Sequence, residues 1–100
     1  MQDITEQQYR EISQNTTNQK KIIIFSAPWC SPCRIFKPIL DKISKELEIP
    51  FYAVNIDECP DLAQELNIRS VPTTFIYNTV PEPTIILGMK SEAEVRNLLA

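Results

Sequence analysis

An apolar stripe near the N-terminus predicts a short helix. Thr5 and Gln8 have the spacing of a capping box, in which each side chain accepts a hydrogen bond from the other residue's backbone N–H. Tyr9 and Ile12 follow at helical spacing and give this helix one apolar face. The polar stretch 14–19 then predicts a loop.

Short apolar segments predict the strands of one central sheet. Residues 21–25 are apolar on both faces and rich in β-branched side chains, which is typical of a strand buried within a sheet. Residues 51–56 have the same character, and residues 73–77 and 84–87 are two further strands. A short additional strand at 2–4 is compatible with the pattern.

A longer helix is predicted before Pro50, which ends it. Six apolar residues recur there at spacings that place them on one face of about four helical turns. They are Ile35, Phe36, Ile39, Leu40, Ile43 and Leu47. Pro38 lies inside this helix, where proline costs roughly 3 kcal/mol and bends the axis, so we expect packing to compensate for a kink.

Two more helices are marked by their first residues. Pro60 suits the first position of a short helix, because its missing N–H would have no helical partner there. Ser91 and Glu94 form a second capping box, which begins the final helix. Their inward-facing residues are expected to be Leu62, Ala63 and Leu66 in the first and Val95, Leu98 and Leu99 in the second.

The order of these elements predicts one α/β domain over residues 1–100, built in three layers. Early alternation of strands and helices favours parallel pairing, whereas the last two strands, joined by a turn at Pro81 and Pro83, suit an antiparallel hairpin. We therefore expect a mixed central sheet of four or five strands flanked by four helices. A chain of 100 residues can form such a core without disulfide staples.

Composition and charge exclude several classes of protein. Hydrophobic residues make up 43% of the chain and the net charge is −3, as in an ordinary soluble domain without a basic patch for nucleic acid. The longest aliphatic run, 22–25, is too short to cross a bilayer, and the polar residues 1–10 are unlike a secretory signal. With an odd count of three cysteines, these features predict a monomeric, cytoplasmic protein with neither nucleic-acid nor membrane partners.

Candidate chemistry is concentrated in Cys30 and Cys33, because the chain has no histidine and so no histidine-based triad or ligand. Cys30 sits where a helix begins, and the N–H groups and dipole there stabilise a thiolate. Pro32 fits the first helical turn, and Cys33 lies over the same turn within reach of Cys30. We expect Cys30 to be exposed as the nucleophile and Cys33 to lie behind it as the resolving thiol.

Three interpretations of this cysteine pair are open: a redox pair, half of a metal site, or inert cysteines. Zinc requires four ligands, and the chain offers one CxxC, the distant Cys59 and no histidine, so redox chemistry is favoured and no bound metal is expected. Lowering a thiol pKa from about 8.5 to about 7 raises the thiolate fraction roughly fifteenfold but reduces nucleophilicity about fivefold. Most of the rate must therefore come from the second cysteine and from orientation of the target.

The segment 25–33, FSAPWCSPC, resembles the active-site segment of the thioredoxin family, whose usual form is WCGPC. The likeness continues in Pro38, in 55–57 and in 68–73, and ends at Gly88. It covers nearly the whole chain in order and spacing, and it implies the thioredoxin fold.

The resemblance also implies an activity, that of a thiol-disulfide oxidoreductase reducing protein disulfides. Cys30 would attack a substrate disulfide, and Cys33 would release the product and leave a Cys30–Cys33 disulfide. A thioredoxin reductase, commonly NADPH-dependent, would restore the dithiol, and the protein itself would need no bound cofactor. The alternatives are a disulfide isomerase or oxidant, and a thioredoxin-fold binding subunit in which redox turnover is secondary.

A substrate-docking surface is implied as well. Val71–Pro72 would be a cis peptide beside the cysteine pair, and the Val71 backbone would pair with a bound substrate chain as an added strand. Trp29, Val71, Pro72 and Gly88 would form this apolar surface. Ordinary packing of Trp29 and Val71, and a simple turn at Gly88, are the alternatives.

Three positions depart from the family pattern. Ile24 and Ala53 stand where many thioredoxins carry a buried aspartate, thought to help deprotonate the resolving cysteine, and a nearby lysine. We hypothesise that Cys33 keeps a raised pKa in an apolar pocket. Ser31 replaces the usual glycine and, with Pro32, tunes the potential; because Ser-Pro is close to Gly-Pro, we expect a reducing protein, somewhat less so than a standard thioredoxin.

Cys59 begins the third predicted helix, at a place similar to that of an extra cysteine linked in animal thioredoxins to regulatory modification or dimers. Glu58 and Asp61 should disfavour its thiolate, although the helix start opposes them. A structural or incidental role is the main interpretation, and regulation is the alternative.

Overall fold

The computed structural model describes residues 1–14, 19–78 and 82–100. Its elements are β1 (Gln2–Asp3), α1 (Glu6–Gln14), β2 (Lys21–Ser26), α2 (Ser31–Leu47), β3 (Phe51–Asn55), α3 (Pro60–Glu65), β4 (Thr73–Tyr77), β5 (Thr84–Leu87) and α4 (Glu92–Leu99). Every predicted helix and strand is confirmed, including the short first strand. Most of the predicted loop at 14–19, and Pro81 of the predicted turn, lie outside the described residues.

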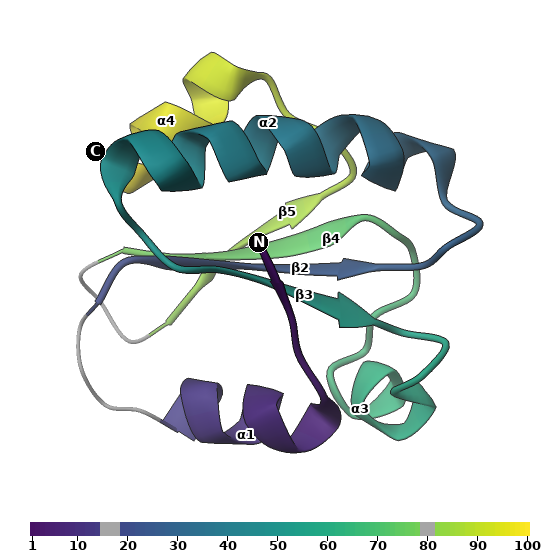
Figure 1. Ribbon diagram of the computed structural model, residues 1–100. Coiled ribbons are helices and arrows are strands. Elements are labelled where there is room, and N and C mark those ends of the chain that lie inside the picture. The colour runs from purple at the N-terminus through teal and green to yellow at the C-terminus, as the bar shows by residue number, and fades with distance from the viewer. Residues whose placement is uncertain (15–18, 79–81) are drawn as a thin grey trace.

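The five strands form one mixed sheet in the order β1-β3-β2-β4-β5. β3 pairs in parallel with β1 and β2, whereas β4 pairs antiparallel with β2 and β5. Helices α2 and α4 cover one face of the sheet, and α1 and α3 cover the other (Figure 1). The predicted mixed sheet and three layers are confirmed.

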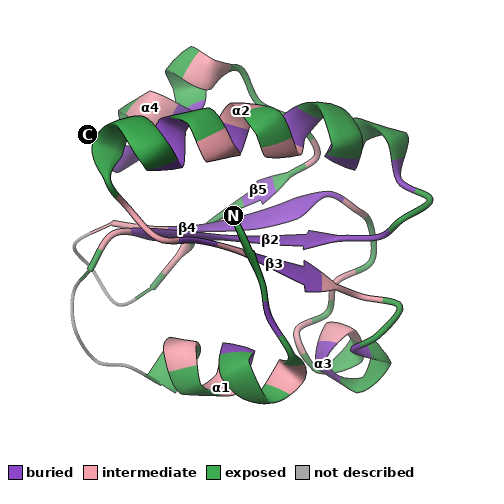
Figure 2. Ribbon diagram, viewed as in Figure 1, coloured by how far each residue is buried: buried purple, intermediate pink, exposed green. Residues whose placement is uncertain are grey.

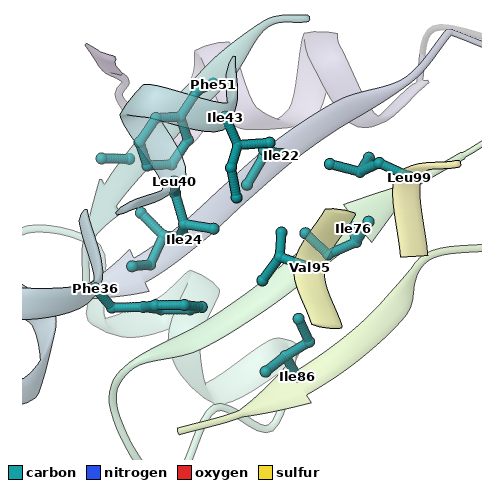
Figure 3. Close-up of a cluster of buried hydrophobic side chains, with 11 residues drawn as sticks. Ile22, Ile24, Phe36, Leu40, Ile43, Phe51, Ile76, Ile86, Val95 and Leu99 are labelled. Atoms are coloured by element: carbon teal, nitrogen blue, oxygen red, sulfur yellow. The ribbon is translucent and has the colours of Figure 1, made fainter. Parts of the chain in front are cut away.

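The central strand β2 connects the cores of the two faces, because all six of its residues are buried (Figure 2). Ile22 and Ile24 point toward α2 and α4, whereas Ile23 and Phe25 point toward α1 and α3. In the α2/α4 core, Ile22 and Ile24 belong to a cluster in which side chains of the sheet and of the helices interdigitate (Figure 3). Burying each of these large apolar side chains stabilises the fold by about 1.5–3 kcal/mol.

The opposite core is organised around an aromatic row. The ring of Phe25 packs edge-on against Tyr9 of α1, with centroids 5.7 Å apart, and against Phe75 of β4 at 4.8 Å. On the same side of the sheet, Arg10 of α1 donates hydrogen bonds of 3.0 and 3.2 Å to the carboxylate of Glu65 in α3. These contacts fasten α1 to the sheet and to α3.

Helix α2 faces the sheet through Phe36, Leu40 and Ile43, all fully buried. The expectation that Ile35 and Leu47 also point inward is wrong, since they are 58% and 43% exposed. Ile35 precedes Phe36 by one residue and so points about 100° away around the helix, and Leu47 lies in the last turn. The expected inward residues Ile39, Ala63, Leu66 and Leu98 are only half-buried.

Both predicted capping boxes are formed. The N–H of Gln8 donates to the Thr5 hydroxyl at 3.1 Å and the N–H of Thr5 donates to the Gln8 side chain at 2.9 Å. Ser91 and Glu94 repeat this pattern at 3.2 and 3.4 Å. Within the described ranges, no helix combines the length and apolar character needed to cross a bilayer.

Candidate active site

The two central cysteines lie where β2 gives way to α2. Cys30 is the N-cap of α2 in extended conformation, and its Sγ accepts a hydrogen bond of 3.2 Å from the N–H of Cys33. Pro32 occupies the first helical turn, as predicted. The cysteine Cα atoms are 5.3 Å apart and the sulfurs are joined in a disulfide, so the predicted reach of Cys33 is confirmed. This arrangement can alternate between a disulfide and a dithiol.

The predicted exposure of Cys30 is wrong for this disulfide form. Cys30 is 4% exposed and Cys33 1%, so Cys30 is the more exposed of the two, as expected, but the difference in exposure is small. Ala27 is buried with the two cysteines, and the half-buried Ile56 and Val71 pack against them. The cover comes from residues distant in sequence, which is why the position of Cys30 at a helix start did not reveal it.

Trp29, next to Cys30, lies on the surface. It is 65% exposed, so its alternative interpretation as ordinary core packing is wrong. Its indole N–H donates to the Asp57 carboxylate at 3.1 Å, and the Asp57 N–H donates to Asn55 Oδ1 at 2.9 Å. Asp57 therefore orients Trp29, a role that the sequence analysis did not assign. The signal was the Asn-x-Asp turn directly after a buried strand.

Arg34 fixes the other side of the same loop. Its guanidinium donates a hydrogen bond of 2.8 Å to the carbonyl of Pro28. The N–H of Cys30 also donates to the carbonyl of Ala27 at 3.1 Å. The loop that carries Trp29 is thus held at both ends by hydrogen bonds.

The cis peptide implied by the resemblance is present at Val71–Pro72. Val71 packs against the cysteine cluster, and the buried Pro72 accepts a hydrogen bond of 2.9 Å from the N–H of Gly88. Gly88 has φ of 75°, a left-handed conformation that favours glycine, and apart from its two chain neighbours nothing lies within 4 Å of where its Cβ would be. Val71 therefore lies at the disulfide, and Gly88 is hydrogen-bonded to the next residue, Pro72.

The two departures at Ile24 and Ala53 are side by side. They are paired in register between β2 and β3 and are 0% and 2% exposed. On its other side Ile24 is paired with Thr74, which is fully buried. Within the described ranges the Thr74 hydroxyl has no hydrogen-bond partner. The raised pKa that we hypothesise for Cys33 in this apolar setting stays a prediction.

Cys59 is a free, buried thiol at the start of α3. Its pKa is raised above the ordinary value by burial and then by the carboxylates of Glu6 and Glu58. The predicted effect of Glu58 is confirmed, but Asp61 is not among the charges responsible. Glu6 comes from α1, so only the tertiary fold brings it to Cys59.

Comparisons with known proteins agree with this geometry. Residues 1–100 match the family model described as Thioredoxin. The chain is 32% identical over 90 residues to thioredoxin M-type, chloroplastic, of Spinacia oleracea, covering 88% of this chain and 49% of that protein. It is 36% identical over 73 residues to the thioredoxin of Rickettsia felis, covering 71% of this chain and 70% of that protein. The chain spans about half or less of the plant relatives that it matches.

Solved structures show the same fold. Chloroplastic thioredoxin z is similar with a TM-score of 0.86 and 24% identity, over 99% of this chain and 90% of that chain. Oxidised mitochondrial thioredoxin 3 of Saccharomyces cerevisiae has a TM-score of 0.80 and 24% identity, over 99% and 92% of the two chains. The predicted thioredoxin fold is confirmed.

Proposed function

The chain belongs to the thioredoxin family, and on that premise we propose that it is a thiol-disulfide oxidoreductase that reduces disulfides in other proteins. The observation that carries this proposal is the Cys30–Cys33 disulfide at the N-terminus of α2. The sulfur of Cys30 receives a backbone N–H there, a contact that favours a thiolate once the pair is reduced.

The reaction proceeds in two exchanges. The Cys30 thiolate attacks one sulfur of the target disulfide, and the other target sulfur leaves as a thiolate that takes up a proton. Cys33, after losing its proton, attacks the Sγ of Cys30 in this mixed disulfide. The target sulfur bonded to Cys30 then leaves as a thiolate, and the Cys30–Cys33 disulfide forms. Two electrons pass to the target. Because Cys33 lies within one helical turn, the second exchange has the high effective concentration of an intramolecular reaction.

The surface around Val71 is proposed to hold the target. Val71 borders the disulfide and is followed by Pro72, and Trp29 offers an exposed ring beside Cys30. An extended target segment would pair with the Val71 backbone, while Gly88 next to Pro72 leaves room for its side chains. Such pairing would bring a target sulfur to Cys30 despite its small exposure.

Recycling requires an outside electron source, which we propose to be an NADPH-dependent thioredoxin reductase, with no resident cofactor on this chain. We also propose a reducing compartment, such as the cytoplasm, as the place of action. The buried Cys59 supports this assignment, because it is a free thiol without a disulfide partner, as is common in proteins of reducing compartments.

The test is reduction of a protein disulfide coupled to NADPH oxidation by a supplied thioredoxin reductase. Cys30→Ser is expected to abolish turnover, and Cys33→Ser is expected to trap a mixed disulfide whose mass is the sum of both proteins. Cys59→Ser is the matched control and should retain the wild-type rate. Full turnover by Cys30→Ser would refute the proposal.

Two measurements separate the rival functions. A redox potential as high as that of the strong periplasmic oxidants would indicate an oxidant instead. The double variant with serine at both positions 30 and 33 distinguishes a binding subunit, since a binding role survives this change and reduction does not.

A further inference from the structure

A cavity of about 460 Å³ lies at the edge of the sheet where the three parallel strands end. Its walls include Asp3, Ser26 and Asn55, the last residues of β1, β2 and β3. Figure 1 shows β2 and β3 ending on the same side of the sheet, after which the chain continues to α2 on one face and to α3 on the other. Where helices diverge in this way beyond the carboxyl ends of parallel strands, they leave a crevice that suits a ligand.

A buried hydroxyl group borders this cavity. Ser26 is only 2% exposed, and among the described residues its side chain makes no hydrogen bond. Side chains alternate along β2, so Ser26 lies on the same face as Ile24, toward α2. Lys37 of α2 borders the cavity on that face. A buried hydroxyl without a protein partner normally bonds to water or to a ligand, so Ser26 marks a place where a polar group is received.

Acidic side chains outnumber basic ones around the cavity. Asp3, Glu6 and Glu58 border it together with a single cation, Lys37. Glu6 is paired with Arg10 at 3.2 Å, so Asp3 and Glu58 are the carboxylates best placed to act on a ligand. The cavity therefore has an excess of negative charge, which favours a cation.

The thiol of Cys59 responds to this negative charge. Cys59 also borders the cavity, and its pKa is raised by burial and then by the carboxylates of Glu6 and Glu58. A metal ion is not the expected cation, because the described part of the chain holds no group of three or more Cys, Asp or Glu side chains placed to bind one. An organic cation is the remaining choice.

The rest of the cavity wall is apolar. Ile4, Ala27, Pro28 and Ala53 line it beside the acidic residues. Lysine and arginine side chains have an apolar stem of three or four methylene groups and a charged end, and the stem packs well on apolar surface. A long basic side chain therefore matches both the apolar wall and the acidic residues.

The cavity is continuous with the loop that carries the disulfide. Ala27 lines the cavity and is also buried together with Cys30 and Cys33. Pro28, which lines it as well, lies two positions before Cys30. An extended chain spans about 3.3–3.6 Å per residue, so a target segment at Cys30 extends about 10 Å along the surface within three residues. That distance is enough to bring one of its side chains to the cavity.

We propose that this cavity binds a lysine or arginine side chain of the target protein, about three residues from the cysteine that Cys30 attacks. The charged group donates hydrogen bonds to the Ser26 hydroxyl and to the carboxylates of Asp3 and Glu58, and no bond is made or broken there. The resulting preference for targets with a basic residue beside their disulfide rests on the proposed function. Because ion pairs at partly exposed carboxylates are weak, this preference is expected to be about threefold to tenfold.

The test compares peptides that contain one disulfide and differ at a single position within four residues of a cysteine. That position carries lysine, norleucine or glutamate, so chain length stays similar while charge changes. For at least one position, the wild type should reduce the lysine peptide with a kcat/KM about threefold to tenfold above that of the norleucine peptide, and the glutamate peptide should be the slowest. Raising the ionic strength from about 0.02 to 0.5 M should shrink the difference. Equal rates for the three peptides at every position would overturn the proposal.

Charge removal then locates the preference. The double variant Asp3→Asn/Glu58→Gln should bring the ratio of the lysine to the norleucine rate close to one. The matched control is Glu11→Gln/Asp61→Asn, which removes the same charge from exposed residues of α1 and α3 that do not border the cavity, and it should keep the wild-type ratio. A ratio that persists in Asp3→Asn/Glu58→Gln would also overturn the proposal.

A binding measurement separates this proposal from the redox function. The same peptides, with serine in place of both cysteines, are titrated into the protein with serine at positions 30 and 33, and NMR follows the backbone amides. Lysine peptides should shift the amides of Ser26, Asn55 and Cys59, and glutamate peptides should not. If these shifts occur while the wild type reduces no peptide, the cavity proposal holds and the proposed function fails. If no lysine peptide shifts these amides, the cavity proposal fails, whatever the rate of reduction.

Discussion

At the scale of single residues, the chemistry depends on a sulfur that is almost covered. Cys30 is 4% exposed, yet the adjacent Trp29 is 65% exposed and is held in place by Asp57. A small exposed area restricts attack to targets that first settle on the surrounding surface. On the proposed function, selectivity among disulfides would therefore arise from docking beside Cys30 more than from the reactivity of its thiolate.

Ile24→Asp tests whether the apolar pair of Ile24 and Ala53 slows release of the target. We expect a faster disulfide reduction, because a carboxylate at this position can accept the proton of Cys33. We also expect a loss of about 3 kcal/mol or more in unfolding free energy, because the side chain is fully buried. Steady-state turnover and urea unfolding measure the two effects.

Ile24→Asn is the control, since it removes the same packing without adding a proton acceptor. It should lose similar stability and show no gain in rate. If Ile24→Asp leaves the rate unchanged or lowers it, the hypothesis is refuted.

At the scale of the elements, α1 is attached to the sheet mainly through the buried ring of Tyr9. Burial, and then the nearby Tyr77, raise the pKa of its phenol well above the usual value near 10. A raised pKa in the folded state gives stability that is complete below pH 10 and is lost as the pH rises further, because the unfolded chain then releases its proton first.

Comparing Tyr9→Phe with the wild type isolates this loss. Between pH 8 and pH 11 the wild type should lose about 1.4 kcal/mol more unfolding free energy than the variant. Lys21 titrates in both proteins and so cancels in the difference, whereas Tyr77 is coupled to Tyr9, so the comparison is repeated in a Tyr77→Phe background. Urea unfolding at the two pH values measures it, and an unchanged difference would contradict the burial argument.

Helix α2 contains Pro38 within an otherwise regular run of 17 residues. Pro38 itself is exposed, so the compensation that we expected from packing comes from its neighbours Phe36 and Leu40, both fully buried. Pro38→Ala restores an N–H that can bond to the Arg34 carbonyl, and it should stabilise the protein by about 1–2 kcal/mol.

Thermal or urea unfolding of Pro38→Ala measures this gain. Lys37→Ala, at another interior position of the same helix, controls for the helix propensity of alanine. A loss of stability in Pro38→Ala would show that the ring makes contacts worth more than the missing hydrogen bond.

The limits of sequence prediction follow from which contacts are local. Caps such as Thr5 and Ser91 involve residues three positions apart, and both were predicted correctly. Glu6 reaches Cys59 only because α1 folds against α3, so its effect on that thiol was missed. Ile35 carried an apolar signal that periodicity alone assigned to the core, although it lies to the side of the buried face. The cover over Cys30 likewise depends on Val71, which is far away in sequence.

At the scale of the whole molecule, the disulfide closes a loop of only three residue steps. In the chain-entropy description such a short loop stabilises the folded state by roughly 2 kcal/mol. By the thermodynamic cycle, folding then makes the pair about 40 mV harder to reduce than in the unfolded chain.

Urea unfolding of the oxidised and reduced protein tests this relation. The oxidised form should be more stable by roughly 2 kcal/mol. The variant with serine at both positions 30 and 33 should resemble the reduced form and show no response to reducing agent. Equal stability of the two redox forms would mean that folding leaves the potential of the pair unaltered.

The position of β2 has a practical consequence for that comparison. Each of its six residues is buried and it is flanked by β3 and β4, so its hydrogen-bonded amides meet solvent only when the entire molecule opens. Deuterium uptake at these amides would thus report the global free energy in native buffer, without denaturant. Comparing deuterium uptake at these amides between the oxidised and the reduced protein would show directly how redox state is coupled to folding.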